Sequence, residues 1–237
     1  MLLSRVVRHG IVRIMNELPV IKQLRMAGKV GMEHVAAWLY KVGKGRISAN
    51  FVTWTSVLLH IPIAVLIARG EFLWAVPLLI IFGLFDAVDG ALARLSGTAD
   101  TSGMVLDSFT DRLKETFVHT GVAYFLAVSG KPALAAIPVA TLGFSLATNF
   151  LKAKAEVAYS VLHDGSIDQH TLNKKFSDGA LSFEVRTAVF ILGLLIAAFV
   201  TRDYVVVAIT EVILMIGIWQ TPKDMKAIFT AIHPAKK

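Results

Sequence analysis

The chain has 237 residues, of which 55% are hydrophobic and 17% are charged, and its formal net charge is +7 at pH 7. The hydrophobic share exceeds that of soluble proteins, and the apolar residues form blocks of about 20, which is the length that spans a bilayer. This composition excludes an ordinary soluble domain, and the lack of Cys excludes disulfides and thiolate metal sites. No recognition module accompanies the basic charge, so we expect lipid headgroups and phosphate substrates as partners, and no nucleic acid.

Residues 1–47 form the first predicted element, a basic amphipathic segment. Cationic side chains recur there among Val, Ile, Leu and Met, which predicts a helix lying on anionic lipid. A helical cap packed against the spans fits the pattern equally well, and both interpretations stay open. We expect no cleaved signal peptide, because the segment lacks a continuous apolar core and a small-residue cleavage site. The cationic residues are Arg5, Arg8, Arg13, Lys22, Arg25 and Lys29.

Six apolar blocks follow and predict an all-α integral membrane protein with six transmembrane helices across residues 48–220. Short polar breaks at 69–71, 129–131 and 201–203 are typical of helical hairpins. The blocks do not alternate as membrane strands do. Residues 221–237 are expected to form a basic cytoplasmic tail. The blocks are Phe51–Ala68, Phe72–Phe85, Val105–Val128, Ala133–Leu151, Phe183–Val200 and Tyr204–Trp219.

The distribution of basic residues predicts the orientation of these spans. With the N-terminus in the cytoplasm, only three of the 24 Lys and Arg residues fall outside, namely Arg69, Lys131 and Arg202. All the others fall inside, as the positive-inside rule requires. We therefore expect a multi-pass protein of the cytoplasmic membrane, with both termini and the polar motif described next on the cytoplasmic side.

A polar motif joins the second and third blocks. It reads D-A-V-D-G-A-L-A-R, then eight residues, then G-M-V-L-D-S-F-T-D. Asp86 and Asp89 share one helical face, as do Asp107 and Asp111, so a hairpin brings four carboxylates together. Two divalent ions would balance their repulsion. Because the motif lacks Cys and His, we expect Mg²⁺, with Mn²⁺ as a substitute, rather than zinc.

The remaining motif residues indicate a diphosphate site. Gly90 and Ala93 allow close approach of helices and ligand, and Arg94 offers a forked contact to phosphate. Farther along the third block, Glu115 and His119 are interpreted as structural polar contacts. A membrane cation transporter using the clustered aspartates is the alternative function, although it predicts mid-bilayer carboxylates and internal repeats. A structural scaffold whose aspartates cap helices is a third possibility.

The motif resembles the signature of the CDP-alcohol phosphotransferase family at all eight fixed positions, and the resemblance covers roughly residues 48–219. It implies six transmembrane helices, usually a homodimer, and a cavity open to the cytoplasm and the bilayer. It also implies transfer of a substituted phosphate from a CDP-linked donor, usually CDP-diacylglycerol, to an alcohol hydroxyl, with release of CMP. By position, Asp86, Asp89 and Asp107 resemble the family's metal ligands, while Asp111 resembles the residue that contacts the second ion and acts as general base.

The same resemblance implies contacts to the donor. Gly90 and Arg94 resemble nucleotide and diphosphate contacts. Asn50 and Thr53 occupy the family's Pro-Asn-x-x-Thr segment, although Ala stands here in place of Pro. The family usually has a hydroxyl residue three positions before the second motif glycine, where this chain has Asp100.

Basic residues after the fourth block predict a phosphorylated acceptor. Lys152, Lys154 and Arg186 resemble acceptor contacts of the branch that makes phosphatidylinositol phosphate. Lys154 replaces the usual Arg, which keeps the charge but loses bidentate geometry. The polar loop at 159–182 is longer than expected of that branch. Inositol phosphate or glycerol phosphate is the expected acceptor; the alternative is positive-inside charge with snorkelling side chains.

Overall fold

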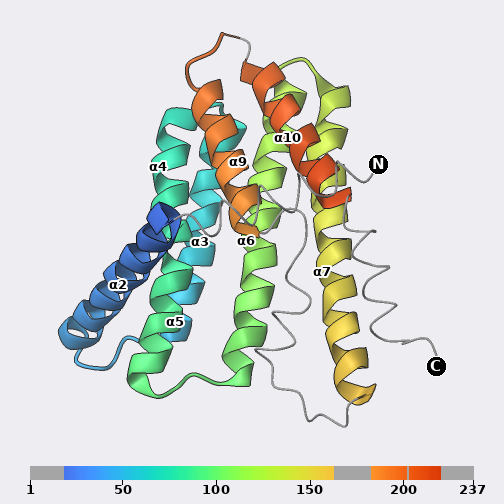
Figure 1. Ribbon diagram of the computed structural model, residues 1–237. Helices are drawn as coiled ribbons and strands as arrows, with labels where there is room; N and C mark the ends of the chain where they lie inside the picture. The colour runs from blue at the N-terminus through green and yellow to red at the C-terminus, as the bar shows by residue number, and fades with distance from the viewer. Residues whose placement is uncertain (1–18, 163–182, 202, 220–237) are drawn as a thin grey trace. The chain divides into compact units, whose positions relative to one another are not determined.

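The computed structural model describes residues 19–162, 183–201 and 203–219, and Figure 1 shows them as ribbons. The first 18 residues, most of the 159–182 loop and the 221–237 tail therefore lie outside the described residues. The described part is all-helical. Its elements are α2 (Pro19–Val42), α3 (Ala49–Ala68), α4 (Phe72–Gly83), α5 (Phe85–Ser96), α6 (Thr101–Val128), the 3₁₀ helix η1 (Pro132–Ala135), α7 (Ala136–Leu162), α9 (Phe183–Ala197) and α10 (Asp203–Trp219).

Three described helical segments are long and apolar enough to cross a membrane: Ala49–Ala68, Phe72–Ser96 and Pro132–Val161. They correspond to the first, second and fourth predicted blocks. Helix α6 has 28 residues, but its first half carries the charged motif. Helices α9 and α10 are apolar but have only 15 and 17 residues. The order of the helices follows the six predicted blocks, whereas six full-length spans are not established.

Several boundaries differ from the prediction, among them the ends of the second and fourth blocks. The second block ends at Gly83, and Leu84 keeps a helical backbone (φ −74°, ψ −15°) before α5 begins. The polar motif therefore starts on α5, which continues the apolar helix almost without a break. Helix α7 runs to Leu162 rather than Leu151, because hydropathy ends a block at the first lysine although Lys and Glu are good helix formers.

The described chain divides into two compact units, and α3, α4 and α6 contribute to both. The first unit contains residues up to Ser56 together with Ile81–Thr110. In it, α2 packs against α5 (Figure 1). Ala36 of α2 belongs to an apolar cluster with Val52, Val88, Ala91 and Leu92. The outward side chains of α2 include Trp38 and Val42, which are 61% and 58% exposed.

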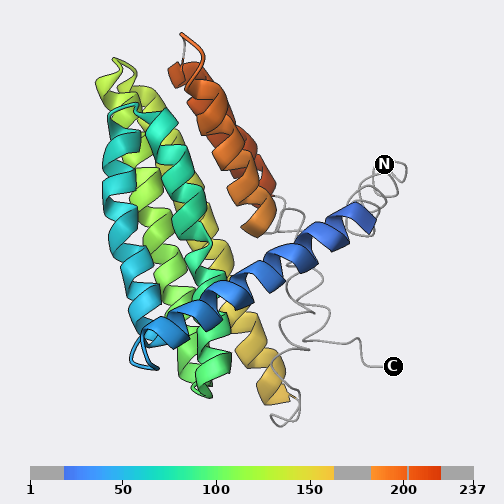
Figure 2. The ribbon, with the colours of Figure 1, turned by 90° about the vertical axis from the view of Figure 1, so that its left-hand side faces the viewer.

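The second unit contains Val57–Ile80 and the residues from Asp111 onward. Helix α10 packs against α7 and α9, and Figure 2 shows α9 and α10 side by side. Small residues allow close helix approach here. A Cβ atom on Gly121 would lie 2.5 Å from the carbonyl oxygen of Ala64, and one on Gly193 would meet Thr210. No side chain fits at either position without displacing the neighbouring helix.

Replacing Gly121 with Ala is expected to lower the unfolding temperature in detergent, because the added methyl group meets backbone rather than a movable side chain. Overpacking of this kind costs about 1–3 kcal/mol. Gly143→Ala on α7 is the matched control, since a Cβ atom there meets nothing within 4 Å. The control should keep or raise the unfolding temperature. Equal behaviour of the two variants would contradict the close packing of α6 on α3.

Candidate active site

The first half of the motif lies on α5, whose orientation is set by packing. Val88, Ala91 and Leu92 are buried. The helix ends at Gly97, whose φ of 68° is left-handed and therefore favours glycine. The Gly97 N–H bonds the carbonyl of Arg94 at 3.3 Å, which closes the helix and turns the chain toward α6.

Asp100 caps the start of α6. Its Oδ1 accepts hydrogen bonds of 2.8 Å from the backbone N–H of Gly103 and from the hydroxyl of Ser102. These bonds, the backbone one foremost, hold the pKa of Asp100 below its ordinary value. The carboxylate is therefore ionised at neutral pH and satisfies an N–H group that the helix itself leaves unpaired. Asp100 thus has a local structural role at the position where the family pattern has a hydroxyl residue.

Three motif carboxylates come together in the first unit. One oxygen from each of Asp86, Asp89 and Asp107 lies within 4.8 Å of the others. Asp86 is half-buried, Asp89 is 7% exposed, and Asp107 is exposed. The buried Thr53 hydroxyl donates a 2.5 Å hydrogen bond to Oδ2 of Asp89, a length typical of a bond to an ionised carboxylate. Thr53 therefore fixes the orientation of the most buried carboxylate in the cluster.

This donor set fits a hard divalent cation. All three ligand atoms are carboxylate oxygens, which Mg²⁺ and Mn²⁺ prefer. Opposite ligands of Mg²⁺ lie about 4 Å apart, close to the spacing observed. Residues that bind metal are commonly oriented by a hydrogen bond from a neighbouring side chain, and Thr53 makes such a bond to Asp89. Asp86, Asp89 and Asp107 are therefore the described residues that would hold a metal ion.

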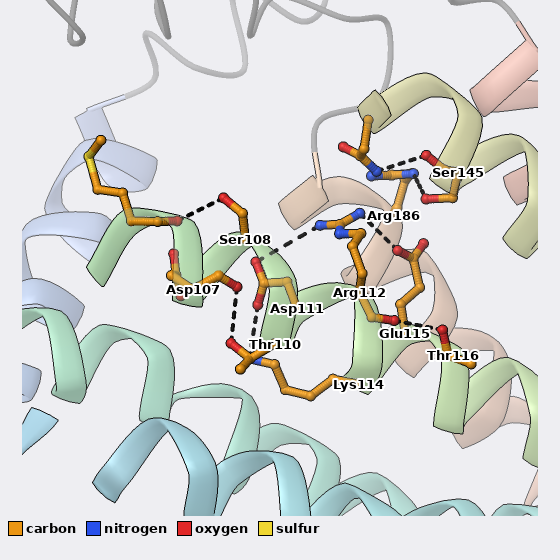
Figure 3. Close-up of polar contacts among 12 residues, drawn as sticks. Asp107, Ser108, Thr110, Asp111, Arg112, Lys114, Glu115, Thr116, Ser145 and Arg186 are labelled. Carbon is orange, nitrogen blue, oxygen red and sulfur yellow. Dashed lines mark hydrogen bonds and ion pairs between the residues drawn. The ribbon is translucent and has the colours of Figure 1, made fainter. Parts of the chain in front are cut away.

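Asp111 lies one turn beyond Asp107 on α6 and falls in the second unit. Its carboxylate lies between two cationic side chains, as Figure 3 shows. The Lys114 Nζ is 2.9 Å from Oδ1, and the Arg112 Nη2 is 3.9 Å from Oδ2. Arg112 is bound more tightly elsewhere, because its Nη1 donates a 2.8 Å hydrogen bond to Glu115.

The predicted donor contacts are spread over α3 and α5 in the first unit. Arg94 is exposed, and a Cβ atom on Gly90 would lie 3.5 Å from its Nη1, so the guanidinium extends over the glycine. Asn50 is exposed at the start of α3, whereas Thr53 is buried against Asp89. Arg94 and Asn50 are accessible to a ligand, whereas Thr53 contacts the carboxylate cluster through Asp89.

The predicted acceptor contacts lie in the second unit. Arg186 on α9 donates a 2.9 Å hydrogen bond to the hydroxyl of Ser145 on α7 (Figure 3). Lys152 is half-buried on α7. Lys154 is exposed, and its Nζ lies 5.5 Å from the centre of the Phe150 ring. Residues two apart on a helix point in different directions, so Lys152 and Lys154 face different surroundings.

The sequence interpretation assigned no role to Lys114, although it is buried and paired with a motif aspartate. The available signal was its position three residues after Asp111 in a predicted span, since charges in such segments are rarely unpaired. His119 was interpreted as a structural contact, and its Nδ1 lies 3.0 Å from Glu211 on α10. Both side chains are buried, and this pair links α6 to α10.

Replacing Thr53 with Val is expected to weaken Mn²⁺ binding, because the nearly isosteric side chain removes the hydrogen bond that orients Asp89. Loss of such an outer partner costs about 10–100-fold in metal affinity. Thr55→Val is the matched control, since the Thr55 hydroxyl donates its hydrogen bond to the carbonyl of Phe51 on its own helix. Isothermal titration with Mn²⁺ makes the comparison, and equal affinities for both variants would show that Thr53 does not act through Asp89.

Comparisons with known proteins match most of the chain, including the helices that carry the motif. The model of the CDP-alcohol phosphatidyltransferase family matches residues 46–222. A phosphatidylinositol phosphate synthase of Cutibacterium acnes is 33% identical over 115 residues, which is 48% of this chain and 56% of that protein. The match thus spans little more than half of that relative's own length.

The fold also resembles that of solved structures. Crystal structures of the Mycobacterium tuberculosis phosphatidylinositol phosphate synthase, one with manganese and citrate and one with CDP-DAG bound, each match with a TM-score of 0.70 and 20% identity. The matches cover 87% of this chain and 92% and 97% of those chains, respectively. At this identity the likeness establishes a common fold.

Proposed function

The chain belongs to the CDP-alcohol phosphatidyltransferase family, and on that premise we propose that it transfers a phosphatidyl group from CDP-diacylglycerol to the hydroxyl of a small phosphorylated alcohol and releases CMP. The observation that carries the proposal is the cluster formed by Asp86, Asp89 and Asp107, together with the exposed Arg94 on the same helix as the first two. Divalent metal held by these carboxylates, together with an arginine in the same unit, would neutralise the negative charge of a diphosphate group.

In this proposal each motif residue has a distinct role. Asp86, Asp89 and Asp107 hold divalent metal, Mg²⁺ or Mn²⁺, which when bound neutralises the donor diphosphate and the departing CMP. Arg94 pairs with the diphosphate, and Gly90 leaves room for it. Asp111 contacts a second ion and takes the proton from the acceptor hydroxyl. The alcohol oxygen then bonds the phosphorus that bears the lipid, and the bond from that phosphorus to the CMP oxygen breaks.

The acceptor in this proposal is inositol phosphate, with glycerol phosphate as the second candidate. Lys152, Lys154 and Arg186 supply positive charge for its phosphate. Two findings support this choice: the similarity to phosphatidylinositol phosphate synthases, and the match at 38% identity over 73 residues to an archaetidylinositol phosphate synthase of Aeropyrum pernix. The M. tuberculosis structure with CDP-DAG bound supports the choice of donor.

The membrane arrangement is part of the same proposal. Residues 48–220 form a six-helix catalytic domain of the cytoplasmic membrane, with its site and both termini on the cytoplasmic side. Residues 1–47 lie on the membrane surface, consistent with the exposed Trp38 and Val42, and residues 221–237 form a basic tail. The protein acts as a homodimer, as is usual in the family.

The direct test is CMP release by purified protein in detergent with Mg²⁺ and CDP-diacylglycerol. Inositol phosphate, glycerol phosphate, inositol and serine are supplied separately. Release with inositol phosphate is expected, and EDTA should stop it until Mg²⁺ or Mn²⁺ is restored. Release only with an unphosphorylated acceptor would overturn the acceptor assignment, and failure to bind CDP-diacylglycerol would overturn the function.

Replacing Lys152 and Arg186 with Ala together is expected to raise the KM for inositol phosphate at least about ten-fold, since two charge-assisted contacts are lost. The KM for CDP-diacylglycerol should change little. Lys131→Ala in the loop before η1 is the control, because Lys131 contacts the Tyr204 ring instead. Equal increases in both KM values would refute a separate acceptor contact. Lys154→Ala, assayed in parallel, tests whether its exposed ammonium contributes.

A further inference from the structure

Lys114 is a buried cation near the middle of α6, in the polar half of that helix. It is 6% exposed, and burial of an ammonium group is costly unless a carboxylate compensates it. Its Nζ lies 2.9 Å from Oδ1 of Asp111. The two residues are three apart on α6, with the acidic residue first, which is a favourable arrangement for an ion pair within a helix.

This ion pair makes the two oxygens of Asp111 different. Oδ1 is buried and faces Lys114, whereas the Asp111 side chain as a whole is 20% exposed. Oδ2 is 3.9 Å from Arg112, which is longer than a hydrogen bond. Arg112 is held instead by Glu115 at 2.8 Å. The Lys114 ammonium is therefore in close ion-pair contact with Oδ1, which has no hydrogen bond among the described residues, while Oδ2 has only the longer contact to Arg112.

We infer that Lys114 is a positioning residue for Asp111: its ammonium group forms an ion pair with Oδ1, so that Oδ2 is the oxygen presented to the acceptor hydroxyl. The inference rests on the proposed function, because it assigns a task to the proposed general base. It adds the residue that orients this base and the oxygen that performs the task.

The same contact has a consequence for metal affinity. A positive charge beside a metal-binding carboxylate opposes the approach of a cation. Lys114 therefore compensates Asp111 in the metal-free protein and lowers its attraction for Mn²⁺.

The test compares Lys114→Met and Lys114→Arg with the unchanged protein. Met keeps most of the side-chain volume but removes the charge, and about ten-fold tighter Mn²⁺ binding is expected by calorimetry, together with a lower unfolding temperature without metal. Arg keeps the charge and should restore the original Mn²⁺ affinity. Lys131→Met removes an equal charge outside the cluster and should leave metal affinity unchanged. Unchanged or weaker Mn²⁺ binding by Lys114→Met would overturn the inference.

A double-mutant cycle with Asp111→Asn measures the coupling of the two side chains, and if Lys114→Met alone does not fold, recovery of folding in the double variant supports the inference. The double variant Asp111→Asn, Lys114→Met leaves no uncompensated charge and should unfold at a higher temperature than the Lys114 variant. Additive effects would show that the two side chains do not interact and would refute the inference.

Kinetics then separate the inference from the proposed function. In Lys114→Met, kcat for CMP release should fall at least about ten-fold, as expected for a misoriented base, while the KM for CDP-diacylglycerol stays constant. An unchanged kcat would overturn the positioning role. If the unchanged protein shows no turnover with any acceptor, the proposed function fails, while the Mn²⁺ and unfolding measurements still decide whether Lys114 compensates Asp111.

Discussion

Replacing Asp111 with Asn is expected to abolish CMP release while CDP-diacylglycerol still binds. The amide is nearly isosteric with the carboxylate but does not accept the proton of the acceptor hydroxyl, and loss of a general base costs about 10²–10⁴-fold in rate. In the proposed function, loss of a contact to a second ion would add to this effect. CMP release under saturating substrates, with donor binding measured separately, makes the comparison.

Asp203→Asn is the matched control for this variant. Asp203 begins α10, where its Oδ1 accepts the N–H of Tyr204, so the same substitution removes a carboxylate that has a local structural contact. Its turnover should remain near that of the unchanged protein. Substantial turnover by the Asp111 variant would show that another residue is the general base.

Replacing Asp89 with Asn is expected to weaken Mn²⁺ binding by more than about 100-fold, because loss of an outer partner alone costs up to that much. Asp89 is the most buried of the three clustered carboxylates and is oriented by Thr53. The variant should therefore lose activity at ordinary Mg²⁺ concentrations. Calorimetry with Mn²⁺ measures the effect directly.

Thermal unfolding separates a metal role of Asp89 from a structural one. The unchanged protein should unfold at a higher temperature when Mn²⁺ is added, and the Asp89 variant should not. Without metal the two should be similar, because the substitution also relieves repulsion between carboxylates. Glu71→Gln, in the short turn before α4, should keep the full metal response. A large loss of stability without metal would indicate that Asp89 is chiefly structural.

The order of the helices and the clustering of the aspartates follow from local features of the sequence. Uninterrupted apolar blocks with short polar breaks predict α3, α4, α7, α9 and α10. Spacings of three and four residues predict that the motif carboxylates share helical faces. Asp86, Asp89 and Asp107 do come together, whereas the roles assigned to them and to Asp111 stay predictions.

The unpredicted features depend on contacts between distant residues. The bond from Thr53 to Asp89 joins residues 36 apart, and the pair formed by His119 and Glu211 joins residues 92 apart. Neither follows from the period of a helix. Lys114 is close to Asp111 in sequence, but its burial depends on helix packing, which spacing alone does not reveal.

The chain assembles its carboxylate cluster from a short stretch of sequence, and this matters for the order of events during synthesis. Asp86, Asp89 and Asp107 all belong to the unit that ends at Thr110. The entropy lost in closing such a short loop is small. All three ligands are translated before α7, α9 and α10. An early metal ion would relieve charge repulsion in the nascent hairpin while the later helices are still to be inserted.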